Sequence, residues 1–189
     1  MVFTDLHVVD ANLNLVHSSF IAQQRLQSLT KPNFINLLTQ NVAPGCTMIV
    51  NRQLLDIALP IPKDVVMHDW WLMQVASLFG RIGYINEPTI AYRQHGLNQV
   101  GAVSRNFFNI LKDVLKGGRL YKCRIDKARL QASILVARYN NNMKKDDLKA
   151  ANTFSRLSSY PILYRQLVAF KSGLKKSGFV RNIGFYLFM

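Results

Sequence analysis

Three short segments hold the side chains best suited to chemistry, and the first of them centres on Asp69. This carboxylate comes directly after a loop and stands at the first turn of an expected helix. In such a place it can face a cleft and take a proton from the hydroxyl group of an acceptor molecule. Asp is also a favoured helix N-cap, because the helix dipole stabilises its charge. The sequence leaves both roles open.

The neighbours of Asp69 are His68, Trp70 and Trp71, and we predict that all three contact an acceptor. An exposed indole beside a carboxylate commonly holds the face of a sugar ring, and exposure of Trp is costly without a reason. The alternative for the tandem indoles is a place in the hydrophobic core for at least one of them.

The second segment is residues 92–98, where an expected strand runs into a glycine-containing loop that carries Arg93 and His95. Arg and His hold phosphate oxygens, and neutral His can ligate a divalent metal. We predict a diphosphate-binding role for both residues and metal ligation by His95. The alternative for His95 is an ordinary surface histidine.

The third segment contains Gly45, Cys46 and Thr47, which follow Pro44 in an expected turn before a short strand. Gly45 lacks a side chain, so a substrate can approach the backbone closely there. We predict that these three residues help to bind the acceptor. An ordinary turn is the equal alternative.

The elements expected around these segments follow an α/β order up to residue 101. Residues 2–9 form an apolar strand, which needs neighbours on both sides. A turn at 10–14 and a return strand at 15–20 follow. Helices are expected at 33–40, 52–57 and 69–79, with Asn51 capping the second. Further strands are expected at 46–50, 82–85 and 89–93, the last two flanking a turn at 86–88.

After Gly101 the pattern becomes helical, so we predict two regions, residues 1–101 and residues 102–189. The apolar stripes of the expected helices are formed by Phe107, Ile110, Leu111 and Val114, then by Leu130, Ile134 and Ala137, and last by Leu163, Leu167, Phe170 and Leu174.

The second region also carries the whole net charge of +14 in this 189-residue chain. Residues 1–101 hold six basic and six acidic residues, whereas residues 102–189 hold 18 basic and four acidic ones. No recognised nucleic-acid motif accompanies this charge, so we expect no nucleic-acid partner. The two cysteines, Cys46 and Cys123, form no CxxC pair, which disfavours a zinc site and fits a reducing compartment.

Three ordered stretches resemble the second half of family 2 glycosyltransferases, in particular the bacterial rhamnosyltransferase-like group that acts in cell-surface polysaccharide synthesis, such as that of lipopolysaccharide. They read FTDLHVVDANLNLVHSSF, NVAPGCTMIVNRQLL and HDWWLMQVASLFGRIGYINEPTIAYRQHGLNQVGA, over about residues 2–102. The resemblance implies part of a GT-A, Rossmann-like domain. It also implies inverting transfer of a sugar, with rhamnose as one candidate, from a nucleotide-sugar donor to a glycan or lipid-linked glycan acceptor.

By the same resemblance, Asp69 corresponds to the catalytic base, and His95 to a histidine that helps to hold the metal–diphosphate group, with Arg93 nearby. The family carries a nucleotide-binding half and an Asp-x-Asp motif upstream of this point, and the intact enzyme is expected to use Mg or Mn. This chain has neither feature, so we expect a truncated protein that is inactive alone.

Residues 161–189 are expected to dock on the cytoplasmic face of the cell membrane as a peripheral element. Their apolar stripe is flanked by Arg165, Lys171, Lys175 and Lys176, and no apolar run reaches the roughly 18–20 residues that span a bilayer. The alternative is that the stripe packs on the protein's own core. For the whole chain, the alternative function is a non-catalytic module that binds a membrane surface or a partner.

Overall fold

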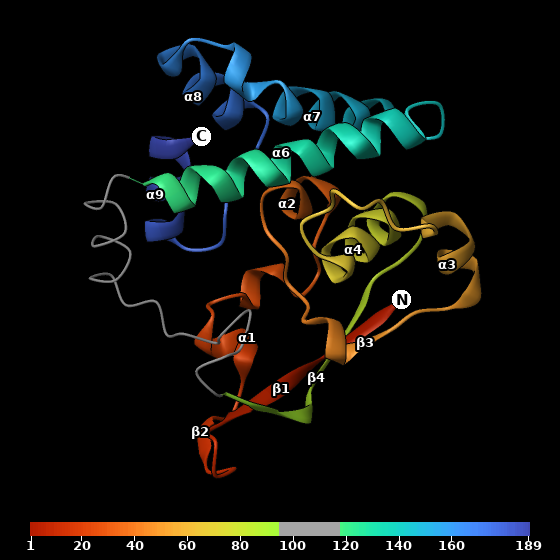
Figure 1. Ribbon diagram of the computed structural model, residues 1–189, viewed down its shortest axis with the longest axis vertical. Helices are drawn as coiled ribbons and strands as arrows, with labels where there is room; N and C mark the ends of the chain where they lie inside the picture. The colour runs from red at the N-terminus through yellow and green to blue at the C-terminus, as the bar shows by residue number, and fades with distance from the viewer. Residues whose placement is uncertain (95–117) are drawn as a thin grey trace.

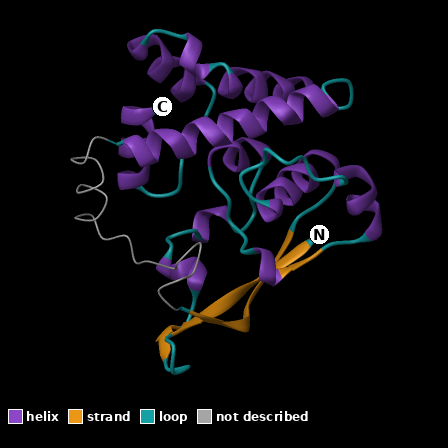
Figure 2. Ribbon diagram, viewed as in Figure 1, coloured by secondary structure: helices purple, strands orange, loops and turns teal. Residues whose placement is uncertain are grey.

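The computed structural model describes residues 1–94 and 118–189 of the chain (Figure 1). Their fold is mixed α/β, with a four-stranded sheet and several helices (Figure 2). In the view of Figure 1, the long helix α6 crosses the middle of the molecule, with the sheet on one side and α7 and α8 on the other. His95 and the stripe predicted at 107–114 lie outside the described residues.

Strand β1 (Val2–Val9) is the centre of the sheet. It pairs in parallel with β4 (Gly83–Arg93) and antiparallel with β2 (Leu15–His17) and β3 (Met48–Ile49). Because Val8 pairs with both β2 and β4, these two strands lie on opposite edges of β1. The expected strand with neighbours on both sides is confirmed, and its neighbours all come from later in the chain.

Strand β4 corrects the expectation of two strands around a turn at residues 86–88. It runs unbroken from Gly83 to Arg93. Pro88 lies opposite Asp5, where the register of the β1–β4 pair shifts. A proline has no N–H to give to the ladder, and such an irregularity accommodates it without ending the strand.

The short helices begin at polar caps that the sequence shows. Asn33 caps α2 (Phe34–Thr39), and Asn51, as expected, caps α3 (Arg52–Ala58) by accepting from Leu54 N–H. The expected strand at 15–20 ends at His17, since Ser19 caps a short helix, α1 (Phe20–Gln23). The strand expected at 46–50 is reduced to β3, preceded by the 3-10 turn η2 (Gly45–Thr47).

Helix α4 (His68–Phe79) is the innermost helix of the first region, with every residue from Asp69 to Ala76 buried. It contacts α2, α3 and η2. The helix predicted at 69–79 is therefore confirmed.

The second region contains α6 (Arg119–Tyr139), α7 (Lys145–Ser155), η3 (Leu157–Ser159), α8 (Ile162–Lys171) and α9 (Phe179–Phe188). The predicted α6 stripe is wrong, because Leu130 and Ala137 are exposed. The buried stripe runs at alternating spacings of three and four along Ile125, Ala128, Ala132, Leu135 and Tyr139.

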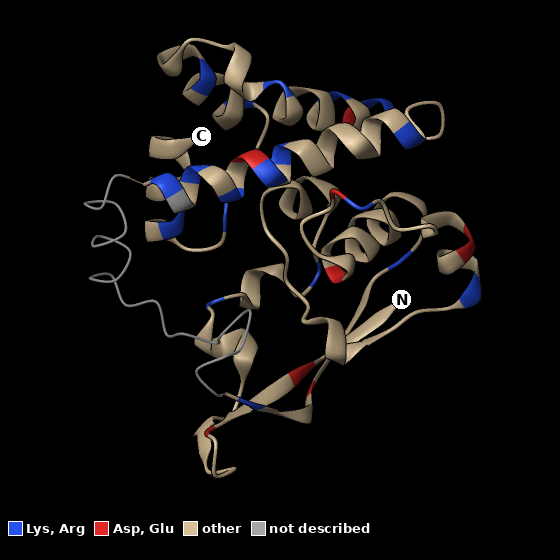
Figure 3. Ribbon diagram, viewed as in Figure 1, with Lys and Arg blue, Asp and Glu red and all other residues tan. Residues whose placement is uncertain are grey.

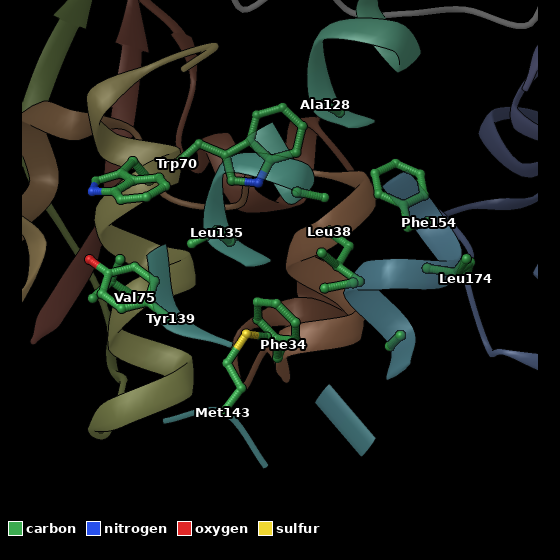
Figure 4. Close-up of a cluster of buried hydrophobic side chains, with 14 of the residues drawn as sticks. Phe34, Leu38, Trp70, Val75, Ala128, Leu135, Tyr139, Met143, Phe154 and Leu174 are labelled. Atoms are coloured by element: carbon green, nitrogen blue, oxygen red, sulfur yellow. The ribbon is translucent and has the colours of Figure 1, made fainter. Parts of the chain in front are cut away.

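The two regions of different composition share one hydrophobic core (Figure 4). Phe34 and Leu38 of α2 and Val75 of α4 belong to the same cluster as side chains of α6 and α7. Two buried glutamines join the regions further, as Gln131 Nε2 donates to Gln74 Oε1 over 2.6 Å. The change of composition near residue 101 thus does not mark a break in the core of the described residues.

Candidate functional site

Asp69 lies where the first turn of α4 meets the turn η2. Its side chain is buried, with 2% of the residue exposed. Oδ1 accepts from the N–H of Trp70 over 2.6 Å, and Oδ2 accepts from the N–H of Gly45 over 3.1 Å. The N-cap position belongs to Met67, which makes no side-chain cap. Asp69 is thus not the N-cap, although it satisfies one of the unpaired donors of the first helical turn.

The electrostatics of Asp69 are those of a desolvated carboxylate. Burial raises its pKa above the ordinary value of 3.8, and this effect exceeds the lowering by the Trp70 N–H, by His68 and by the Gly45 N–H. A general base works best when its pKa lies near the working pH. The shift therefore has the direction that proton abstraction requires.

Gly45 is packed directly against Asp69 and His68. A Cβ at this position would stand 3.0 Å from His68 Nε2 and 3.3 Å from Asp69 Cβ, which is tighter than ordinary contacts. In this structure the start of α4 approaches the Gly45 backbone closely, and the substrate approach expected at Gly45 stays a prediction. The glycine lets its own N–H reach the carboxylate of Asp69.

The rest of η2 divides into an exposed and a buried residue. Cys46 is exposed as a residue, but its thiol is partly shielded from water, and this desolvation together with the charge of Asp69 raises the pKa of the thiol. Thr47 is buried, and its Oγ1 donates to the carbonyl of Pro44 over 2.8 Å. The acceptor role predicted for Thr47 is corrected to closure of this turn, whereas exposed Cys46 and His68 stand beside Asp69.

Both tryptophans belong to the core, which corrects the expectation of an exposed sugar platform. Trp71 is 0% exposed and donates its Nε1–H to the carbonyl of Ala58. Trp70 is also buried and donates its Nε1–H to the carbonyl of Leu37. With both ring donors satisfied internally, the pair fixes α4 against its neighbours, and neither ring face is presented to a ligand.

The structure does not bring Arg93 to Asp69. Gly45–Thr47 precedes β3, which pairs with the beginning of β1, whereas Arg93 pairs with Val9 at its end. Six strand residues separate the two ends of β1, or about 20 Å. Arg93 is exposed, and His95 lies outside the described residues.

A divalent metal does not fit the residues that the structure describes. Across residues 1–94 and 118–189, no three His, Cys, Asp or Glu side chains come together as a metal site requires. We therefore derive no chemical step through a metal.

A support for the Asp69 loop that the sequence did not reveal comes from α6. Gln131 is fully buried, and its Oε1 accepts from the backbone N–H of Val66 over 2.7 Å. This bond holds the segment just before His68 in place. A glutamine on the apolar side of a helix is a weak signal, and its partner is 65 residues away in the sequence.

The chain is similar over part of its length to a protein named dTDP-rhamnosyl transferase RfbG from Shigella flexneri. The two are 37% identical over 67 residues, which cover 31% of this chain and 23% of the relative. The chain thus matches less than a quarter of that protein. No protein-family model matches the chain, and no solved structure matches it. The similarity supports a glycosyltransferase-like character for the matched part and no finer assignment.

Proposed function

We propose that this chain is the acceptor side of an inverting glycosyltransferase of the GT-A type. The intact enzyme would transfer a sugar, with rhamnose as the first candidate, from a nucleotide-sugar to a glycan or lipid-linked glycan during synthesis of a cell-surface polysaccharide. One observation carries the proposal: a desolvated carboxylate, Asp69, held at a helix start between exposed His68 and Cys46. The partial similarity to a rhamnosyl transferase supports the reaction class.

In the proposed reaction, an acceptor hydroxyl approaches Asp69 beside His68 and Cys46. Its oxygen attacks the anomeric carbon of the donor, and its proton passes to the Asp69 carboxylate as the new bond forms. The bond from the anomeric carbon to the diphosphate breaks on the opposite side, and the diphosphate leaves with that electron pair. The N–H of Gly45 keeps Oδ2 of Asp69 in place throughout.

The donor, its metal and the diphosphate contacts of Arg93 and His95 belong to the same proposal. Mg or Mn would be bound by the intact enzyme, mainly through residues that this chain does not contain. We expect the 189-residue chain alone to turn over no nucleotide-sugar.

The test is Asp69→Asn in a longer protein that includes a nucleotide-binding half. Removing the base is expected to lower turnover by roughly 10²–10⁴-fold. Asp64→Asn, which changes an exposed carboxylate on the same segment, is the matched control and should leave turnover unchanged. Equal turnover by the Asp69 variant and the parent would contradict the proposal.

A second candidate is a non-catalytic module that binds a membrane surface or a partner. It is favoured by the exposed apolar side chains on α8 and α9. In either case we propose a peripheral position on the inner face of the cell membrane, with no nucleic-acid partner. No helix among the described residues is both long enough and apolar enough to cross a bilayer.

A further inference from the structure

The last two helices expose apolar side chains on the faces turned away from the core. On α8, Leu163 is 82% exposed and Phe170 is 74% exposed, with Leu167 exposed between them at the same helical face. On α9, Phe179 is 79% exposed, and Ile183 and Leu187 follow it at spacings of four. We call these six residues the apolar face.

The apolar face is distinct from the side chains that anchor the two helices. Ala169 of α8, Phe185 of α9 and Leu174 between the helices are each fully buried in the shared core. The stripe predicted from the sequence therefore divides, because Leu174 turns inward while Leu163, Leu167 and Phe170 remain in contact with solvent.

Side-chain hydrogen bonds tie α8 to the C-terminal end of α9. Gln166 Nε2 donates to the carbonyl of Tyr186, and Arg165 Nη1 donates to the carbonyl of Met189 over 2.6 Å. Tyr186 in turn donates its hydroxyl to the carbonyl of Leu174. The exposed side chains thus project from a folded helix pair and not from a loose end.

The chain segment that carries the apolar face holds charges of one sign, although Asp126 of α6 lies near Arg165. From Leu148 to the end of the chain there are seven Lys and Arg residues and no Asp or Glu. Lys171 at the end of α8 and Lys175 after it are exposed. Figure 3 shows Lys and Arg on the helices of this part of the molecule. An apolar surface edged with cations matches a bilayer whose headgroups are anionic and whose interior is apolar.

We infer that the exposed apolar side chains of α8 and α9 insert into the headgroup region of an anionic bilayer, with Lys171 and Lys175 against lipid phosphates. Phe and Leu side chains would reach the acyl boundary, whereas the long lysine stems extend to the headgroups. This surface does not depend on the transferase reaction, since vesicle binding needs neither donor nor acceptor.

The test uses the whole 189-residue chain and phosphatidylcholine vesicles with or without phosphatidylglycerol. The chain should sediment with vesicles that contain phosphatidylglycerol, and high salt should weaken this binding. Replacing Leu163, Phe170, Phe179 and Ile183 by Ser should weaken binding about tenfold or more. The matched control replaces Leu13 and Leu15 by Ser. These two leucines are exposed at the start of β2, and the control should bind vesicles as the parent does.

Tryptophan fluorescence tests directly whether the apolar face inserts into the bilayer. Phe179→Trp places an indole on the apolar face, and its emission should shift to the blue when vesicles are added. The native indoles, Trp70 and Trp71, are buried in the core and supply a constant background. Leu13→Trp is the control and should not respond.

Three results would overturn the inference. The serine variant could bind anionic vesicles as tightly as the parent, or the Phe179→Trp emission could stay unchanged while the chain sediments. The third is a parent chain that self-associates without vesicles and becomes monomeric in the serine variant, with no vesicle binding by either. That outcome would assign the apolar face to a second copy of the chain.

Discussion

The Asp69 carboxylate combines two opposing influences on its pKa, and burial outweighs the hydrogen bonds from Trp70 and Gly45. The folded protein consequently holds the Asp69 proton more tightly than the unfolded chain does. Protonated Asp69 stabilises the fold at acidic pH, and this stability is lost as pH rises from about the unfolded pKa through the folded one. A group suited to accept a proton is thus also a group whose ionisation weakens the fold.

This linkage predicts a pH-dependent difference between the parent and Asp69→Asn. The free energy of unfolding of the parent, minus that of the variant, should fall as pH rises above the ordinary aspartate pKa of 3.8 and level off once Asp69 is ionised in the folded state. Urea unfolding from about pH 3 to about pH 7 measures it. A difference that rises with pH would show that Asp69 is stabilised as the anion.

Gly45 supports a second prediction at the scale of one residue. In Gly45→Ala, the new methyl would press on His68 and Asp69, and the variant should lose about 1–3 kcal/mol of unfolding free energy. Gly83→Ala is the control, because its Cβ would meet Val2 at 3.4 Å, an ordinary contact. Equal stability of the two variants would mean that η2 can shift away from α4 without cost.

At the scale of elements, α4 depends on a buried polar chain that runs through two glutamines. Gln74 Nε2 donates to the carbonyl of Leu37, and Gln131 connects Gln74 with the Val66 N–H. The chain therefore links α2, α4, α6 and the segment before Asp69. Every donor along this path has a partner, so removing one member leaves buried groups unpaired.

We predict that Gln131→Met costs about 1–3 kcal/mol of unfolding free energy, since the Val66 N–H and Gln74 Oε1 lose their partner. Gln74→Met combined with Gln131→Met should cost less than the sum of the two single changes, with a coupling of about 0.5–3 kcal/mol. Denaturant unfolding of the four proteins measures the coupling, and the exposed Gln53→Met is the control. Strict additivity would refute the link between α4 and α6.

The sequence predicts these elements well where local rules govern them and poorly where tertiary contacts decide. Asn51 at the start of α3 and the apolar run of β1 are local signals, and both expectations are confirmed. The burial of Trp70 depends on the carbonyl of Leu37, 33 residues away, which no spacing rule reveals. The stripe predicted on α6 lies on the wrong face, because Ala128 and Ala132 of the buried stripe carry no strong hydrophobic signal in the sequence.

In the candidate site, too, local features can be predicted from the sequence, whereas tertiary contacts cannot. Asp69 at the start of a helix, beside a Pro-Gly turn, is readable from residue types and local order. The contact of Asp69 with Gly45 depends on tertiary structure and cannot be read from the sequence. The same holds for the separation of Arg93 from Asp69 along β1. Helical spacing predicts one apolar stripe from Leu163 to Leu174, and the structure buries Leu174 but leaves Leu163, Leu167 and Phe170 exposed. Whether lipid covers them stays a prediction.

At the scale of the whole molecule, the charge distribution separates two regions of the chain, whereas the hydrophobic core joins them. The net positive charge comes from residues 102–189, whereas the largest core cluster contains side chains from both regions. A change of surface composition therefore does not imply a separate folding unit. The prediction of two regions stays a prediction, and the largest core cluster contains side chains from both of them.

We predict that residues 1–101 do not fold alone, since Leu38, Trp71 and Val75 would lose the cover that α6 and α7 provide. Thermal unfolding followed by circular dichroism should show a cooperative transition for the full chain and none for the fragment. A cooperative transition in the fragment would instead establish residues 1–101 as an independent domain.

Two hydrogen bonds between the end of α2 and the segment before α9 have a consequence for the synthesis of the protein. Thr39 Oγ1 donates to the carbonyl of Lys175, 136 residues later, and Ser177 N–H donates to Gln40 Oε1. A ribosome adds about 5–20 residues per second, so α2 waits on the order of ten seconds for these partners to emerge. For most of that wait, until α6 and α7 have been made, the apolar sides of α2 and α4 lack the cover that these helices provide. Translation speed and chaperone supply should accordingly govern its yield in cells.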